Sequence, residues 1–341
     1  MKVRKIYIWS AAIVAILAIV ILLLFVLRLP QVVLPEISIA AEPVFELFGF
    51  TITNTLLATW LTMIVLIVVS WATTRRLKVV PGRWQSLFET LIEGFYNLVE
   101  GVAGKKWTPK FFPIVMSIFL FLLVSNLLGL TPLFGGYGVL HHSEEGFPVQ
   151  WLNEAHTIGL WQPLPRLVEP DTAREALAEA GGGYVLSPFF RSAATDLNTT
   201  LALALVSVGL TQYFGFKARG IGYLGKFIAV GGVVRAFTKP GLGCLGRIGQ
   251  FFMGFIDLFV GLLEIISEFS KIISFSFRLF GNIFAGEVLL GVMGFLIPYL
   301  VSLPFFGLEI FVGVVQALVF MMLTVAFFVL AITEHGPEEG H

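Results

Sequence analysis

Charged residues are scarce in this sequence. Only 13% of its 341 residues are Asp, Glu, Lys or Arg, whereas about 25% is usual in a soluble domain. The 22 basic and 22 acidic residues also balance to a formal net charge of zero. A nucleic-acid-binding protein needs a basic face that displaces counterions from phosphates, so a nucleic-acid partner is not expected. With 57% hydrophobic residues, the composition instead indicates a polytopic membrane protein whose surroundings are the lipid bilayer.

Cysteine is almost absent, because Cys244 is the only one. An intrachain disulfide and a thiolate metal site are therefore excluded. Several histidines and glutamates share one polar stretch but lack helical i, i+4 metal spacing, and we interpret them as a solvated loop: His141, His142, Glu144, Glu145 and His156. We expect neither a metal nor a cofactor.

A nucleotide site is also not expected. The run "GIGYLGKF", residues 220–227, has the glycine spacing of both common phosphate-binding motifs. However, Phe227 stands where a P-loop needs Ser or Thr, and no strand is predicted before the run. The chain itself should therefore contain no catalytic nucleotide site.

Long apolar runs predict about five to six membrane helices. Residues 6–27 follow the basic "MKVRK" and are interpreted as an anchor, with a cleaved signal peptide as the alternative. Further spans are predicted at 53–72, 111–130 and 197–216, and a last one at 305–332. Basic residues follow two of these spans, in "RRLKVVPGR" and "KARGIGYLGK", which places both loops and the C-terminal tail in the cytoplasm by the positive-inside rule.

Between these spans we expect three other features. Residues 84–100 have apolar positions three and four apart, which predicts an amphipathic helix lying along the membrane interface. About sixty residues, roughly 133–194, form an external loop that includes a short helix-like run, "TAREALAEA". Residues from about 249 to 333 form a long helical hairpin. Because a helix over 250–290 would be about 60 Å long, it must lie obliquely, break, or project from the bilayer.

The hairpin carries polar residues where hydrocarbon is expected, above all Arg278 in "IISFSFRLFGNIFAGEVLL". An arginine at that depth costs about 2.5–3.5 kcal/mol and cannot release its proton. On a regular helix Glu264, Lys271 and Asn282 lie within about 40° of Arg278, Glu268 about 80° away, and Glu287 about 180° away. In the last span, Glu309 and Gln316 share one side.

Structural roles could explain these residues. Arg278 could form an inert ion pair or extend to an interface, and Asn282 and Gln316 could simply hydrogen-bond between helices. Glu264 and Glu268 could lie at a solvated helix end. In the functional alternative an ion travels through the hairpin, because desolvation keeps a buried carboxylate protonated whereas a fixed cation drives the proton off. No carboxylate of this chain suits that role well, which suggests a partner on another chain.

Five blocks of the sequence together resemble a known family. They are "FRLFGNIFAGEVLL", "GVVQALVFMMLTVAFFVLA", "SNLLGLTP", "TDLNTTLALAL" and "KARGIGYLGK". In this order they resemble the a subunit of the membrane sector of F-type ATP synthases, over roughly residues 53–335. The resemblance implies an all-α membrane domain over 53–341. The anchor helix and external linker expected over 1–52, and the insert at about 133–194, exceed what the shared blocks require.

The resemblance also implies roles and partners. Arg278 matches the family's essential arginine, which faces the carboxylates of a rotating ring of c subunits. Asn282 and Gln316 match its polar neighbours, Glu287 and Glu309 match the outer half-channel, and Glu264, with Glu268 nearby, matches the cytoplasmic half-channel. Other implied partners are the b-subunit stator stalk and further ATP synthase subunits. We expect a bacterial plasma membrane location, a cytoplasmic C-terminus, and the proton as the ion.

One hypothesis is specific to this sequence. Many relatives have one carboxylate and one histidine where this chain has Glu287 and Glu309, so we expect these two glutamates to share a proton.

The alternative to the whole assignment is a secondary transporter, which would place charge at its substrate site and often shows an inverted repeat. No such repeat is visible, and a purely structural membrane scaffold would not explain the five blocks.

Overall fold

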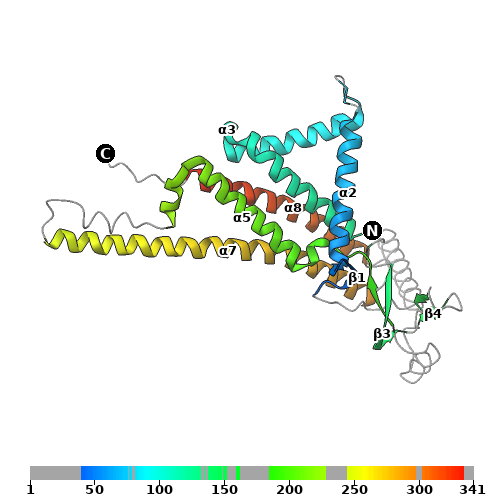
Figure 1. Ribbon diagram of the computed structural model, residues 1–341. Coiled ribbons are helices and arrows are strands. Elements are labelled where there is room, and N and C mark those ends of the chain that lie inside the picture. The colour runs from blue at the N-terminus through cyan, green and yellow to red at the C-terminus, as the bar shows by residue number, and fades with distance from the viewer. Residues whose placement is uncertain are drawn as a thin grey trace, which may run out of the picture. The chain divides into compact units, whose positions relative to one another are not determined.

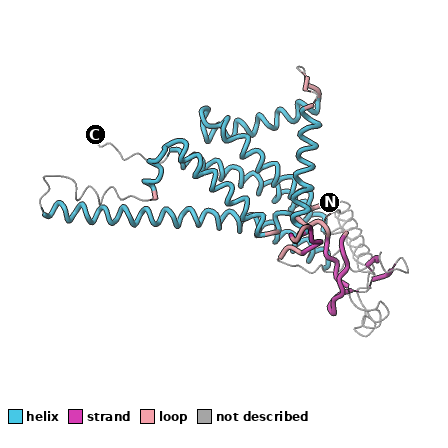
Figure 2. Tube along the Cα trace, viewed as in Figure 1, coloured by secondary structure: helices cyan, strands magenta, loops and turns pink. Residues whose placement is uncertain are grey.

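The computed structural model describes residues 40–75, 77–78, 81–131, 134, 137–147, 149–151, 159–161, 184–227, 244–296 and 302–333. Four predicted features lie outside these residues: the anchor at 6–27, the helix-like run "TAREALAEA", the hairpin turn and the C-terminal tail. The described chain is mainly helical (Figures 1 and 2). The predicted all-α class is therefore confirmed.

Besides the short 3₁₀ helix η1 (Ala193–Thr195), six helical segments make up most of the described part of the chain. They are α2 (Asn54–Thr74), α3 (Arg83–Gly129), α5 (Leu197–Arg219), the 3₁₀ helix η2 (Gly220–Lys226), α7 (Cys244–Leu296) and α8 (Ser302–Thr333). Within the described residues, four stretches are long and apolar enough to cross a membrane: Asn54–Thr74, Gln85–Gly129, Leu197–Lys226 and Ser302–Thr333. The prediction of a polytopic helical membrane protein is thus confirmed.

The amphipathic helix and the following span are separated by a glycine. Helix α3 is interrupted at Gly104, whose φ of 71° and ψ of 158° are not helical. A residue with a side chain rarely adopts such a positive φ, so glycine is well suited to this break. The predicted segments 84–100 and 111–130 therefore fall on opposite sides of Gly104.

Helix α7 is 53 residues long and unbroken, which at 1.5 Å per residue is about 80 Å. Of the three arrangements that the sequence allowed, a break into two helices is therefore wrong. No proline or glycine pair interrupts the stretch from Gln250 to Leu290, which explains its continuity. An oblique or projecting α7 stays a prediction.

The chain divides into two compact units. Unit 1 comprises residues 1–54, 130–191 and 285–311, and unit 2 comprises 55–129, 192–284 and 312–341. Each of the three segments of unit 1 contains a stretch that the predicted topology places on the external side of the membrane. The predicted division into 1–52 and 53–341 stays a prediction.

Unit 1 contains short antiparallel strands that the sequence analysis did not predict. Strand β1 (Pro43–Leu47) pairs with β2 (Phe50–Thr53). Within the insert, β3 (Gly138–Phe147) pairs with β6 (Tyr184–Pro188), and β4 (Val149–Trp151) pairs with β5 (Gly159–Trp161). The expectation of a plain loop is therefore wrong here. Apart from the ten-residue β3, these strands have only three to five residues, which is too few alternations for a period of two to stand out.

The core of unit 2 is formed by helices α3, α5, α7 and α8. Phe111, Phe214 and Phe328 come from three of these helices, and their ring centroids lie 4.8–5.0 Å apart. Phe275 of α7 lies 4.9 Å from Phe320 of α8. Hydroxyl pairs add polar links between helices, because Ser207 lies 2.9 Å from Thr324. Such small polar contacts are typical of helix packing in membranes.

Candidate functional site

Arg278 lies on an exposed face of α7. One terminal nitrogen (Nη2) lies 3.5 Å from Ser274 Oγ, and the guanidinium carbon lies 6.0 Å from the centre of the Phe275 ring. Its neighbours Ile273 and Phe277 are also more than half exposed. Among the residues that the structure describes, no carboxylate forms an ion pair with Arg278. The alternative of an ion pair inside the chain therefore finds no support in the described residues.

Asn282 and Gln316 form a direct link one helical turn beyond Arg278. Asn282 Nδ2 donates a hydrogen bond to Gln316 Oε1 at 2.7 Å. Gln316 is only 4% exposed, and its own amide nitrogen has no hydrogen-bond partner among the described residues. This bond joins α7 to α8, as one of the structural interpretations anticipated. The bond also shows that these two amide side chains face each other between the two helices of the hairpin.

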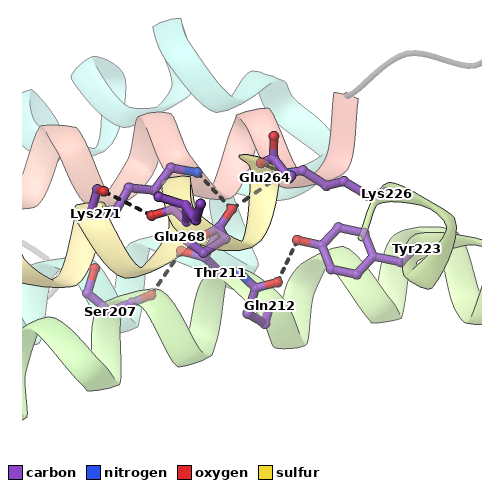
Figure 3. A network of polar contacts seen from close by, with 10 residues as sticks. Ser207, Thr211, Gln212, Tyr223, Lys226, Glu264, Glu268 and Lys271 are labelled. Atoms are coloured by element: carbon purple, nitrogen blue, oxygen red, sulfur yellow. Dashed lines mark hydrogen bonds and ion pairs between the residues drawn. The ribbon is translucent and has the colours of Figure 1, made fainter. Parts of the chain in front are cut away.

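A second cluster joins η2 to α7 (Figure 3). Lys226 Nζ lies 2.8 Å from Glu264 Oε1 and 3.4 Å from Glu268 Oε1. Lys271 Nζ lies 2.8 Å from the same oxygen of Glu268. Glu268 is 8% exposed, and its second oxygen has no hydrogen-bond partner among the described residues. A solvated helix end, which the sequence analysis left open, does not describe Glu268.

The local sequence explains how Lys226 reaches α7. Helix α5 ends at Gly220, whose φ is 62°, a conformation that glycine adopts without strain. The chain then folds back as η2, and Tyr223 donates a hydrogen bond of 2.8 Å to Gln212 on α5 (Figure 3). Gly215 leaves room for the Tyr223 ring, because a side chain there would overlap it. Gly220, the first glycine of "GIGYLGK", thus has a structural role.

On unit 1, Glu287 is held by an arginine that sequence reasoning missed. Arg191 Nε donates to both oxygens of Glu287 at 3.1 and 3.3 Å, and Nη2 donates to Oε2 at 3.0 Å. Nη1 donates to the Ala40 carbonyl at 3.5 Å. Arg191 is 7% exposed, whereas the Glu287 side chain is 40% exposed. The only signal in the sequence was one arginine in an apolar "FFRSAA".

Glu309 has a different environment in the same unit. The residue is 7% exposed and no hydrogen bond or ion pair to it is found among the described residues. Its carboxyl group lies against the backbone of Gly286 on α7, in the space that a side chain at Gly286 would fill. Glu309 is therefore buried beside the residue that precedes Glu287.

Among the described residues, the structure thus brings the predicted site residues together in two pairs and leaves Arg278, Glu287 and Glu309 without a direct contact to one another. Glu264 and Glu268 share lysine partners, and Asn282 bonds Gln316. Glu287 pairs with Arg191 and no described contact joins it directly to Glu309. Arg278 contacts none of the predicted carboxylates in the described part of the chain. A proton shared by Glu287 and Glu309 stays a prediction.

Comparison with known proteins agrees with these observations. A family model described as ATP synthase A chain matches residues 56–329. The sodium-ion-specific ATP synthase subunit a of Propionigenium modestum is 30% identical over 315 residues, covering 89% of this chain and 82% of that protein.

Two further relatives have the same description. ATP synthase subunit a of Desulfotalea psychrophila is 29% identical, covering 82% of this chain and 83% of that protein. The subunit a of Desulforamulus reducens is also 29% identical, covering 83% and 81% respectively. Since the family match spans most of the sequence, including the helices that carry Arg278 and Gln316, the chain belongs to the ATP synthase A chain family, the ion-translocating a subunits of the membrane sector of ATP synthases.

Proposed function

We propose that this chain is the stator subunit that passes protons between the two sides of the membrane by way of a rotating ring of c subunits. Each ring subunit brings one carboxylate past Arg278. The guanidinium favours the ionised carboxylate, so it makes the arriving acid release its proton and prevents the two half-channels from connecting directly. Rotation of the ring then drives ATP synthesis elsewhere in the complex.

This proposal rests on the surroundings of Arg278, which is exposed and has no carboxylate partner among the described residues. A permanent cation in an apolar helix is costly unless an anion compensates it. The described residues of this chain supply no such anion to Arg278, and its exposed neighbours are the apolar Ile273 and Phe277. This combination suits an apolar partner helix that carries a single carboxylate. A c subunit has this chemistry.

The two groups of glutamates supply the two half-channels. Glu264 and Glu268 contact Lys226, the last residue of the basic run "KARGIGYLGK" that is predicted to be cytoplasmic, so they suit the inner half-channel. Glu287 and Glu309 belong to unit 1, which contains the segments predicted outside, so they suit the outer half-channel. Asn282 and Gln316 form the polar link nearest to Arg278 in sequence and helix register.

Other parts of the assignment follow from the family. The complex supplies a b-subunit stalk and further ATP synthase subunits as partners. The insert at about 133–194, with its short strands, is available on the outer side for contacts with other stator components. The protein then resides in a bacterial plasma membrane with its C-terminus in the cytoplasm.

Replacement of Arg278 tests the proposal. In the whole complex, reconstituted into liposomes, Arg278→Ala should abolish proton-driven ATP synthesis, because a ring carboxylate would pass without releasing its proton. Passive proton leak through the membrane sector should rise. ATP synthesis and the decay of an imposed pH gradient are both measured.

The matched control is Arg75→Ala. Arg75 is exposed and its guanidinium carbon lies 4.8 Å from the Trp71 ring centre at the end of α2. This variant loses one arginine without touching the hairpin, so it should retain normal synthesis. Normal proton-driven synthesis in the Arg278→Ala complex would overturn the proposed function.

A further inference from the structure

The two glutamates of the outer half-channel have unequal partners. Glu287 accepts three hydrogen bonds from Arg191, at 3.0–3.3 Å. A bidentate arginine–carboxylate pair is among the strongest polar contacts in proteins, and its geometry requires the ionised carboxylate. Since the Arg191 guanidinium is a permanent cation, this pairing gives the Glu287 carboxylate a fixed counter-charge.

Glu309 has no corresponding cation. Its carboxyl group is buried against Gly286, and among the described residues it forms no ion pair. The charged groups of the same unit with described contacts are otherwise engaged: Arg191 contacts Glu287, and Glu42 accepts a hydrogen bond from Ser187. A buried carboxyl group without a cation is the one that more readily holds a proton.

From this geometry we propose that Arg191 is a positioning residue of the outer proton path, and that it keeps Glu287 ionised so that Glu309 alone takes up and releases the travelling proton. The proton enters from outside, binds a Glu309 carboxylate oxygen, and leaves for the carboxylate of a ring subunit, which regenerates the Glu309 anion. Glu287 stays an anion throughout. The inference rests on the proposed function, and it replaces the predicted sharing of a proton between the two glutamates.

The burial of Arg191 supports a dedicated role. An arginine that is 7% exposed must be compensated, because removing one member of a buried ion pair leaves an unpaired charge. Nη1 also binds the Ala40 carbonyl, which fixes the orientation of the guanidinium. Arg191 and Glu287 are 96 positions apart, so the pair also joins the insert's end to α7.

Charge-matched variants of the whole complex test this assignment. Arg191→Gln alone should reduce proton-driven ATP synthesis by about tenfold, because the freed Glu287 competes for the proton. The double variant Arg191→Gln with Glu287→Gln should recover to within about threefold of the original rate, since a neutral amide pair replaces the ion pair. Glu309→Gln should lose about a hundredfold or more, as expected when a proton carrier is removed.

Two further variants separate charge from assembly. Arg191→Lys should lie between Arg191→Gln and the original protein, because an ammonium group keeps the charge without the bidentate geometry. Arg75→Gln, which removes an exposed arginine, should have no effect. The amount of this chain in the purified complex is measured for every variant. If Arg191→Gln fails to assemble, the double variant decides.

The contrary outcomes are distinct. A double variant that assembles but is as inactive as Glu309→Gln would show that Glu287 itself carries the proton. A double variant that does not assemble would show that the complex requires the charge of Glu287, and not only the neutralisation of that charge by Arg191. Either outcome would overturn the inference. An unimpaired Arg191→Gln would also overturn the inference. Arg278→Ala serves as the reference, because its failure to block synthesis would overturn the proposed function, whereas the Arg191 series concerns this inference only.

Discussion

At the scale of single residues, the glutamates of this chain differ in what surrounds them. Glu264 and Glu268 face lysines, Glu287 faces an arginine, and Glu309 faces a glycine backbone. A cation beside a carboxylate compensates its charge, whereas a buried carboxyl group without one has no such compensation. The neighbours of these glutamates therefore give them unequal electrostatic environments.

Gly286 provides a test at this scale. An alanine methyl group at this position would overlap the carboxyl group of Glu309, so Glu309 would have to leave its site or α8 would have to shift. Overpacking of this kind costs about 1–3 kcal/mol, and we expect Gly286→Ala to reduce proton-driven ATP synthesis by about tenfold. The synthesis rate of the reconstituted complex is measured.

Gly294→Ala is the control for this substitution. Gly294 lies on the same helix, and no atom of the described residues lies within 4 Å of the position where its side chain would start. Alanine also has a higher helix propensity than glycine, so this variant should be as active as the original. Equal activity of the two alanine variants would contradict the packing of Glu309 against Gly286.

At the scale of elements, the return of η2 along α5 positions Lys226. The fold-back depends on Gly220, on the Tyr223–Gln212 hydrogen bond, and on the space at Gly215. Lys226 then contacts Glu264 and Glu268 on α7 (Figure 3). A short 3₁₀ segment that follows α5 thus contacts the hairpin helix α7 through Lys226.

We expect Gly215→Ala to detach this segment. The new methyl group would lie 2.5 Å from Cε2 and Cζ of Tyr223, which is too close, so the ring and its hydrogen bond to Gln212 would be displaced. Amide hydrogen exchange over residues 220–227 should therefore become faster, as measured by mass spectrometry on the purified complex.

Gly209→Ala is the matched control on the same helix, because no atom lies within 4 Å of the point where a methyl group would be added. Exchange over 220–227 should stay unchanged in this variant. Unchanged exchange in Gly215→Ala as well would show that Tyr223 does not depend on the space at Gly215.

At the scale of the whole molecule, the pairing of its carboxylates bears on which ion it carries. A sodium ion prefers a site with several oxygen ligands and net negative charge. Here Glu264, Glu268 and Glu287 each face a lysine or arginine, so none of these three carboxylates offers sodium an oxygen site free of a cation. The proton is the ion of the proposed function, and the Propionigenium modestum relative is described as sodium-ion specific.

Ion dependence is measured on the reconstituted complex. ATP-driven acidification of the vesicles should proceed in sodium-free buffer and should be abolished by a protonophore. Added sodium should not change the rate. ATP hydrolysis coupled to sodium uptake that persists with the protonophore would instead show a sodium-transporting complex.

Much of the fold could be predicted because its causes are local. The scarcity of charge, the apolar runs and the five sequence blocks indicated an all-α membrane protein of this family, and Gly104 lies between the two predicted parts of α3. The hairpin helices were also expected, with bounds near those of α7 and α8. Helix periodicity and hydrophobic length depend on neighbouring residues alone, so they are visible in the sequence.

The amino-acid sequence by itself determined that the chain enters a membrane, where its helices lie, and which polar residues are unusual there. Only the tertiary structure decided the partners of those residues: Arg191 for Glu287, Lys226 for Glu264, and Gln316 for Asn282. Their positions are separated by 34–96 residues. Many arginines, lysines and amides could satisfy a given carboxylate, and the packing of distant segments selects one of them.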